Sequence, residues 1–382
     1  MNPSTPGLKS TTEPLGLFAQ VQPGLEAPLA AELRDLGFDA VEAVPGGATF
    51  AGGWTEAMRA NLWSRGAGRI LVRIASFRAP HLAQLDKRAR RVDWSCLATG
   101  VPVRVEASCR KSRIYHDGAA AQRVAGALEA AGVPVAEDAG LAVAVRIEDD
   151  LCTVSVDTSG APLHKRGHKE AVGKAPMRET MAAMVLRACG YDGSEPVLDP
   201  MCGSGTFVIE AAEIACGLAP GRSRGFAFER LAAFDADAWA AMRAAGGGDG
   251  APALGFTGSD RDAGAFARAR DNAARAGVAE LCSFEKRAVS EIAPPEGPPG
   301  LVVVNPPYGG RIGGKARGGR TLHPLYGALG SALSERFRGW RVGLVTTDPG
   351  LVKAAGLPWR EPGPPIAHGG LKVRLWQTGP LT

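Results

Sequence analysis

The chain has 382 residues, 45% of them hydrophobic, which is enough for two or three hydrophobic cores. Its net charge of +5 permits a nucleic-acid partner without requiring one, and its seven cysteines contain no Cys-x-x-Cys pair, which argues against a disulfide framework or a metal cluster. No apolar run approaches the ~18 residues of a membrane span, and the polar residues 1–14 lack the apolar core of a signal peptide. We therefore expect a cytoplasmic protein that binds neither a membrane nor a metal, with a disordered tail over residues 1–14.

The first elements predicted after this tail form a small α+β unit. Leucines recur on one stripe between residues 25 and 36, which is typical of an amphipathic helix. A Pro-Gly-Gly turn at residues 45–47 separates two short segments and predicts a hairpin. The pattern predicts a strand over 15–21, a helix over 25–36, a hairpin over 39–50 and a helix over 54–63.

Strand and helix patterns continue to alternate up to residue 156. Pro102 marks the segment 101–107 as an edge strand, because proline lacks the N–H group that a central strand donates. We expect a strand over 70–75, a basic helix over 81–91, the strand over 101–107, a helix over 119–131 and a hairpin formed by 141–147 and 151–156.

Positive charge is concentrated in this part of the chain. Between Arg65 and Arg113 there are twelve basic and three acidic residues, a net charge of +9, which favours a polyanionic partner. At the end of this window, cations lie beside a tyrosine and a histidine, a composition that suits gripping a nucleic-acid backbone and stacking a base. A solvated loop is the alternative. The candidate RNA-binding residues are Arg110, Lys111, Arg113, Tyr115 and His116, together with Lys165 and Arg166 of the basic segment 164–169.

From residue 177 onward, strands and helices alternate as in a parallel α/β sheet. The expected helices cover 177–189, 207–214, 262–276 and 322–338, and the expected strands cover 197–199, 254–259, 281–286, 301–304, 341–346 and 371–376. Residues 219–250 interrupt this order and carry four aromatic residues, so we expect a helical insertion that packs them. The Gly- and Arg-rich residues 309–320 suit a mobile loop that closes over RNA. The last strand would complete a seven-stranded sheet.

A loop of small residues follows the first strand of this sheet. Its two glycines, Gly203 and Gly205, let a ligand approach the backbone, and the N-terminus of the next helix favours a negative group. A dinucleotide-binding loop would have a third glycine where this chain has Val208, and a Walker loop would need Gly-Lys-Ser/Thr. The candidate ligand-binding residues are Asp199, Pro200, Met201, Cys202, Gly203, Ser204, Gly205 and Thr206.

A second candidate site follows the strand over 301–304. Two prolines end this strand, so Asn305 lies at the carboxyl edge of the sheet, where open α/β sheets bind ligands. The Asn305 side-chain carbonyl and the Pro306 carbonyl can converge on one point and accept both N–H groups of an exocyclic amine, while Tyr308 offers a face for stacking. A simple Asn-Pro turn is the alternative. The candidate catalytic residues are Asn305, Pro306, Pro307 and Tyr308.

An acid and two glycines, followed much later by Asn-Pro-Pro-Tyr, resemble the class I S-adenosylmethionine (SAM) methyltransferases that act on amino nitrogens. The resemblance implies SAM as cofactor, with its methionine part held by residues 199–206. It also implies that Asp260, after the second strand, accepts the ribose hydroxyls; a helix N-cap is the alternative for this residue. Relatives usually place an acid against the adenine amine at the end of the third strand. Ala288 stands there in this chain, so only its backbone can contribute.

The segments NLWSR, VDWS, SRIYHDG, PLHKRGH and APMRET resemble, in this order, the N-terminal half of bacterial THUMP-domain RNA methyltransferases, with the 23S rRNA guanine-N2 methyltransferases as the nearest likeness. The likeness covers nearly the whole chain from Leu15 on. It implies a ferredoxin-like domain over 15–66, a THUMP RNA-binding domain over 67–165 and a Rossmann-like methyltransferase domain over 166–382. The implied reaction is methylation of the N2 amine of a guanine in RNA, with rRNA ahead of tRNA.

Several alternatives share the Asn-Pro-Pro-Tyr motif. They are a tRNA guanine-N2 methyltransferase, an adenine-N6 methyltransferase acting on RNA or DNA, and a protein glutamine methyltransferase; the basic N-terminal half disfavours the last. An alternative of another class is a catalytically silent RNA-binding assembly factor. The intact Asp199, Gly203, Gly205, Asn305 and Tyr308 argue against that alternative.

Overall fold

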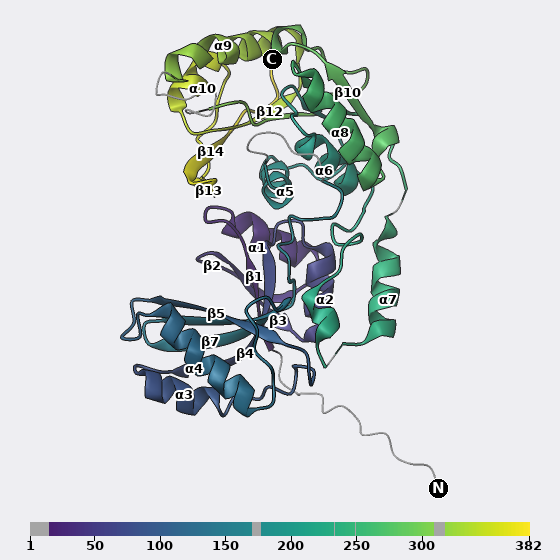
Figure 1. Cartoon of the computed structure of the whole chain (residues 1–382). Coiled ribbons are helices and arrows are strands. Elements are labelled where there is room, and N and C mark those ends of the chain that lie inside the picture. The colour runs from purple at the N-terminus through teal and green to yellow at the C-terminus, as the bar shows by residue number, and fades with distance from the viewer. Residues whose placement is uncertain (1–14, 170–176, 233, 249, 309–317) are drawn as a thin grey trace.

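Two seven-stranded sheets organise the part of the chain that the structure describes (Figure 1). The computed structural model describes residues 15–169, 177–232, 234–248, 250–308 and 318–382. The predicted tail over 1–14 and most of the predicted loop over 309–320 lie outside these residues.

The N-terminal sheet has the strand order β2-β3-β1-β4-β7-β6-β5. Its strand β4 pairs antiparallel with β1 on one side and with β7 on the other, so the two predicted N-terminal units share one sheet. The predicted border between residues 66 and 67 stays a prediction. The strand β5 lies at the sheet edge, as Pro102 predicted. The elements are β1 (Leu15–Gln20), α1 (Glu26–Asp35), β2 (Asp39–Val44), β3 (Gly47–Gly52), α2 (Trp54–Trp63), β4 (Arg69–Arg78), α3 (Leu82–Ala89), β5 (Val103–Arg110), α4 (Asp117–Ala130), β6 (Leu141–Glu148) and β7 (Leu151–Asp157).

The C-terminal sheet, called the catalytic sheet below because it carries the candidate catalytic residues, has the strand order β10-β9-β8-β11-β12-β14-β13. Its first five strands are parallel, whereas β14 runs antiparallel to β12. The expectation of a seven-stranded sheet is confirmed, although its seventh strand, β13, and the helix α10 were not predicted. The elements are α5 (Glu179–Ala188), β8 (Val197–Asp199), α6 (Thr206–Ala215), η1 (Ala227–Arg230), α7 (Ala236–Ala244), η2 (Ala245–Gly247), β9 (Phe256–Asp260), α8 (Ala263–Ala276), η3 (Ala279–Leu281), β10 (Cys282–Lys286), η4 (Val289–Glu291), β11 (Leu301–Val304), α9 (Gly318–Arg336), β12 (Arg341–Thr346), α10 (Pro349–Ala355), β13 (Ile366–His368) and β14 (Leu371–Gln377).

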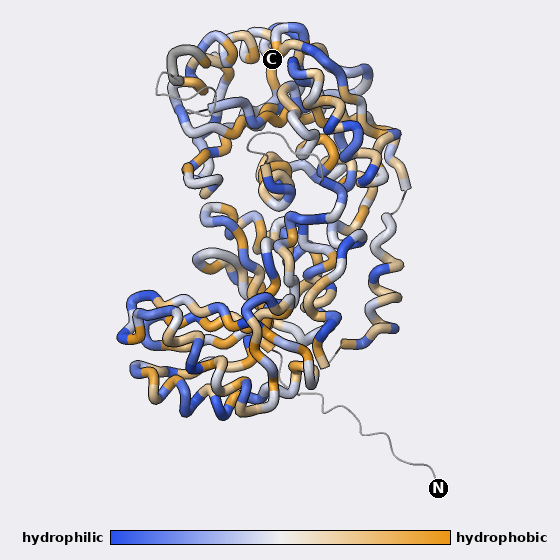
Figure 2. Tube along the Cα trace, in the orientation of Figure 1, coloured by the Kyte–Doolittle hydropathy of each residue, from blue (hydrophilic) through white to orange (hydrophobic). Residues whose placement is uncertain are grey.

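The hydrophobic core follows both sheets. All four residues of β11 are at most 1% exposed, as expected for a central strand of a parallel sheet that is covered on both faces. Figure 2 shows hydrophobic residues along the strands and hydrophilic residues on the outer turns of the N-terminal sheet. In the described ranges, no helix combines the length and apolar character needed to cross a bilayer.

The predicted insertion over 219–250 is helical and joins the two halves of the protein. Its aromatic residues pack together, with the rings of Phe228 and Trp239 edge to face at 4.9 Å between centroids. The Phe228 N–H donates to the Thr158 carbonyl at 3.0 Å, and α7 lies beside α2 of the N-terminal half (Figure 1). The insertion therefore buries its aromatics at the junction with the N-terminal sheet.

Candidate active site

Three strand ends meet at one edge of the catalytic sheet. The strands β9, β8 and β11 are neighbours and run parallel, so their carboxyl ends lie side by side. The chain runs from β8 to β9 and β10 on one side, and then crosses to β11 on the other side of β8. Ligands of open α/β sheets bind at such a reversal of strand order. The fold thus brings residues 199–206, Asp260 and Asn305 to one edge.

The loop over residues 199–206 is fixed by hydrogen bonds to the neighbouring strand. The Cys202 N–H donates to the Ser259 carbonyl at 2.9 Å, and the Gly203 N–H donates to Asp260 Oδ2 at 3.1 Å. Gly205, with φ of 82°, is the N-cap of α6. Gly203 has φ of 54°, and a Cβ built on it would meet no atom within 4 Å among the described residues. The loop therefore presents open backbone at the N-terminus of α6.

The two acids of this edge have different surroundings. Burial raises the pKa of Asp199 to about 8, opposed by the hydrogen bond from the Met201 N–H and reinforced by Asp260. An approaching cation favours the ionised form of such a carboxyl, so Asp199 suits a positively charged ligand group. Asp260 accepts from the Asp262 N–H at 2.9 Å, whereas Asp262 itself is the N-cap of α8. The capping role that was the alternative for Asp260 thus belongs to Asp262.

The Asn-Pro-Pro-Tyr segment leaves β11 as predicted. The Oδ1 atom of Asn305 is buried, and in the described part of the chain it has no hydrogen-bond partner. A buried acceptor without a partner costs about 1–3 kcal/mol, so it marks a place where a ligand donor fits. The Tyr308 side chain is only 3% exposed and packs in the core. Its predicted stacking role stays a prediction.

A residue that the sequence analysis did not single out supports this segment. Tyr326 of α9 is fully buried, and its hydroxyl donates to the Pro307 carbonyl at 3.2 Å and lies 3.2 Å from Thr346 Oγ1 of β12. Burial raises the pKa of Tyr326 to about 12, so the hydroxyl keeps its proton. Tyr326 therefore holds the turn that carries Asn305. A tyrosine within an apolar helix offers no sequence signal for this contact.

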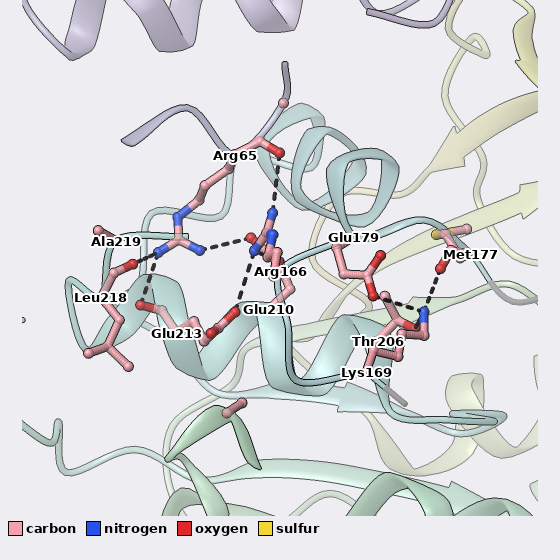
Figure 3. Close-up of polar contacts among 12 residues, drawn as sticks. Arg65, Arg166, Lys169, Met177, Glu179, Thr206, Glu210, Glu213, Leu218 and Ala219 are labelled. Carbon is pink, nitrogen blue, oxygen red and sulfur yellow. Dashed lines mark hydrogen bonds and ion pairs between the residues drawn. The ribbon is translucent and has the colours of Figure 1, made fainter. Parts of the chain in front are cut away.

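A buried cluster of charges ties the N-terminal half to α6 (Figure 3). Glu210 accepts from Arg65 at 2.9 Å and also from Arg166, and Glu213 lies 3.4 Å from Arg166 and 2.6 Å from Arg222. The Arg166 side chain is 1% exposed. The guanidinium of this candidate RNA-binding residue is thus buried and paired with Glu210 and Glu213, although its Nε has no hydrogen-bond partner among the described residues.

The burial of Arg166 could not be predicted from the basic composition of the segment 164–169. A buried guanidinium needs paired carboxylates, and these lie far along the chain in a helix whose sequence is mostly apolar. The signal that could have shown the burial of Arg166 is the pair Glu210 and Glu213 within that helix. Lys165 is exposed, and its predicted role stays a prediction.

The other candidate RNA-binding residues lie at the surface, at the end of β5 and the start of α4. Tyr115 is 85% exposed, and Arg110, Lys111 and Arg113 are exposed as well. His116 also has a structural role, because its Nδ1 accepts from the Ala119 N–H at 3.1 Å and caps α4. In Figure 1 this region belongs to the N-terminal sheet, away from the catalytic sheet.

Ala288 lies two residues beyond the end of β10, as the N-cap of the short helix η4. The preceding Arg287 N–H donates to the Asp260 carbonyl at 3.1 Å. This backbone is thus tied to the strand end that carries Asp260. Contact of Ala288 with a cofactor stays a prediction. In the ranges described above, no group of three or more His, Cys, Asp or Glu side chains could hold a metal ion.

Comparisons with known proteins match both halves of the chain. The family model described as "RMKL-like, methyltransferase domain" matches residues 166–361, and the model described as "RlmL ferredoxin-like domain" matches residues 16–71. A protein of Synechocystis sp. (strain ATCC 27184 / PCC 6803 / Kazusa), named "Putative RNA methyltransferase slr0064", is 31% identical over 387 residues, which covers 98% of this chain and 98% of that protein.

Solved structures match over nearly the full length. SMU.472, described as "a putative methyltransferase complexed with SAH" (S-adenosylhomocysteine), is 27% identical, with a TM-score of 0.87 over 97% of this chain and 100% of that chain. A Listeria monocytogenes protein named "predicted N6-adenine-specific DNA methylase" is 29% identical, with a TM-score of 0.85 over 96% of this chain and 97% of that chain. SAH is what remains of SAM after methyl transfer, and the open loop at Gly203 fits such a cofactor. The protein is therefore a SAM-dependent methyltransferase and belongs to the RMKL-like methyltransferase family.

Proposed function

We propose that the protein methylates the exocyclic N2 amine of a guanine in RNA, with rRNA ahead of tRNA as the substrate. The observation that carries this proposal is the buried Oδ1 of Asn305, an acceptor for which the described residues supply no donor. An exocyclic amine brings two N–H groups. One would bond Asn305 Oδ1 and the other the Pro306 carbonyl, at the sheet edge where the cofactor loop begins.

These two acceptors would raise the low nucleophilicity of the target amine. The lone pair of guanine N2 is delocalised into the ring, which makes this nitrogen a weak nucleophile. Acceptors that draw its hydrogens offset that delocalisation and stabilise the positive charge that develops on nitrogen, and they also align it. When bound, SAM supplies a methyl group on a sulfonium. A base cannot reach such a pocket while stacked, so it would leave the stack and come to rest against Tyr308, with Pro307 shaping the turn.

The cofactor would lie along the ends of β8, β9 and β10. In this proposal residues 199–206 hold the methionine part, with the Asp199 carboxyl near the ammonium group. Asp260 accepts the ribose hydroxyls, and the backbone at Ala288 lines the adenine. Asp260 already accepts from the Gly203 N–H, so its carboxylate is held beside the loop.

Replacing Asp260 by Ala is expected to weaken SAH binding by about 1.5–3 kcal/mol, because a charged acceptor for the ribose is removed. The neighbouring Asp262 provides a matched control, since its carboxylate caps α8 instead. Asp262→Ala should lower the stability by about 1 kcal/mol and leave SAH affinity nearly unchanged. Titration calorimetry and thermal unfolding of both variants check this. Equal loss of SAH affinity in both variants would contradict a ribose contact of Asp260.

RNA binding is assigned in this proposal to the exposed end of β5, within the predicted THUMP domain. Changing Arg110, Lys111 and Arg113 to Ala is expected to weaken RNA binding and to lower the salt slope by about 0.7–0.9 for each phosphate that the variant no longer neutralises. Tyr115 and His116 would stack a base or sugar. SAH affinity should not change. The control is the triple variant Lys87→Ala, Arg88→Ala, Arg91→Ala, which removes the same charge from exposed positions in and just after α3.

Fluorescence-anisotropy titration of RNA at several salt concentrations distinguishes the two triple variants. If both variants reduce the RNA affinity and its salt dependence equally, the end of β5 contributes only its positive charge and forms no specific site. If the salt dependence of RNA binding is unchanged in the Arg110, Lys111 and Arg113 variant, the end of β5 does not contact RNA phosphates.

The reaction itself is tested by mapping modified nucleosides in total RNA from a deletion strain by mass spectrometry. The expected result is loss of one N2-methylguanosine from rRNA, restored by the wild-type gene and not by the Asn305→Ala variant. Adenine-N6 methylation is the second candidate, because the Listeria relative is named an N6-adenine-specific DNA methylase and adenine N6 is also an exocyclic amine. Loss of N6-methyladenosine with all N2-methylguanosines retained would replace the first proposal by the second.

A further inference from the structure

Lys169, in the segment between the two halves of the protein, reaches the first residue of α6. Its Nζ lies 2.7 Å from the Met177 carbonyl, 2.9 Å from Thr206 Oγ1 and 3.3 Å from Glu179 Oε1 (Figure 3). An ammonium group has three N–H donors and no acceptor. The three oxygens therefore use all its donors, and Lys169 has none left for a ligand.

This arrangement decides which way the Thr206 hydroxyl points. Because Lys169 only donates, Thr206 Oγ1 accepts, and the hydroxyl proton has to point away from the ammonium. The structure shows no acceptor for that proton among the described residues. Thr206 is partly exposed and follows Gly205, at the positive end of α6. A carboxylate is the ligand group that such a helix end favours, and a hydroxyl donor there would add a charge-assisted hydrogen bond.

We propose that Lys169 is a positioning residue that orients the Thr206 hydroxyl to donate to the methionine carboxylate of the cofactor. The inference rests on the proposed placement of the methionine part in residues 199–206. It adds Lys169, which lies between the domains and outside the loops of the catalytic sheet, to the residues that shape the cofactor site. It also assigns Thr206 the role of a hydrogen-bond donor.

The surroundings of Lys169 keep it in place. Its side chain is 10% exposed, and that of its partner Glu179, near the start of α5, is 7% exposed. Burial lowers the pKa of Lys169, while Glu179 raises it. Three residues earlier, Arg166 is paired with Glu210 of the same helix α6. One short segment therefore contacts both the N-terminus and the middle of α6.

The test compares two ligands by calorimetry on the full chain: SAH, and its decarboxylated analogue, which lacks only the carboxylate. Lys169→Met and Thr206→Val are each expected to weaken SAH binding about 10- to 100-fold and to leave the analogue nearly unaffected. The double variant should bind SAH no more weakly than Thr206→Val alone, because Lys169 acts through that hydroxyl. Thr206→Ser keeps the hydroxyl, so it should bind SAH nearly as tightly as the wild-type protein. Lys353→Met, an exposed lysine of α10, is the control.

Three results would overturn the inference: both ligands weakened equally, neither weakened, or effects that add in the double variant. If Lys169→Met lowers the thermal stability, the comparison of the two ligands in Thr206→Val still tests whether the hydroxyl binds the carboxylate. A failure of the underlying placement looks different. In that case the wild-type protein either does not bind SAH or binds SAH and its decarboxylated analogue with the same affinity.

Discussion

The Asn305→Ala variant is expected to lose about 100- to 1,000-fold in the rate of methyl transfer, the typical effect of removing one preorganised electrostatic group. The reason is that Asn305 Oδ1 is a buried acceptor placed at the sheet edge for the target amine. SAH affinity should stay within a few-fold of wild type, because the cofactor lies against residues 199–206 and Asp260. Single-turnover kinetics with excess enzyme measure the chemical step, and calorimetry measures SAH binding.

Two comparisons sharpen this experiment. Asn305→Asp keeps an oxygen at the Oδ1 position, so it should retain more activity than Asn305→Ala if accepting from the amine is what matters. Tyr326→Phe removes the hydroxyl that holds the Pro307 carbonyl, and it should reduce the rate less than Asn305→Ala. A rate for Asn305→Ala within a few-fold of wild type would remove Asn305 from the catalytic residues.

The second large effect is expected on stability. Replacing Arg166 by Met should lower the free energy of unfolding by about 3–5 kcal/mol, because it leaves buried carboxylates without their shared cation. Burial raises the pKa of Glu213, but Arg166, His168, Arg222 and Arg65 together bring it below its usual value. Glu213 is thus ionised inside the protein. Without Arg166, Glu213 keeps Arg222 and Glu210 keeps Arg65, so the loss of stability is expected toward the lower end of this range.

The matched control is Arg146→Met. This arginine pairs with Glu148 on the N-terminal sheet, but its side chain is 49% exposed. An exposed pair contributes little, so the variant should change stability by about 0.5 kcal/mol or less. Urea unfolding followed by circular dichroism compares the two variants. Similar small changes in both would mean that the cluster around Arg166 contributes no more than a surface ion pair.

The sequence by itself determined the elements that depend on neighbouring residues. The apolar residues 301–304 followed by two prolines predicted a buried strand that stops at Asn305, and β11 does so. Acid and glycines in residues 199–206 predicted the loop before α6 in the same way. The leucine stripe predicted a helix over 25–36, and α1 covers Glu26–Asp35. Such features are local because chain stiffness, missing N–H groups and side-chain periodicity act over a few residues.

The family resemblance carried the sequence analysis further, to the cofactor and the type of fold. Both are confirmed, since the methyltransferase model matches residues 166–361 and the related SMU.472 is complexed with SAH. The base that is methylated did not follow from the motif, because guanine N2 and adenine N6 both present an exocyclic amine to the same two acceptors.

Only the tertiary structure decided which residues become partners across long stretches of chain. It placed β4 between β1 and β7, so that the N-terminal units share one sheet. It buried Arg166 and Lys169 of a segment that reads as a solvated basic linker, and it brought the Tyr326 hydroxyl to the Pro307 carbonyl. The physical reason is the same in each case. Whether a strand edge is paired, or a charge is buried, depends on where a complementary group from a distant part of the chain comes to lie, and local composition does not contain that position.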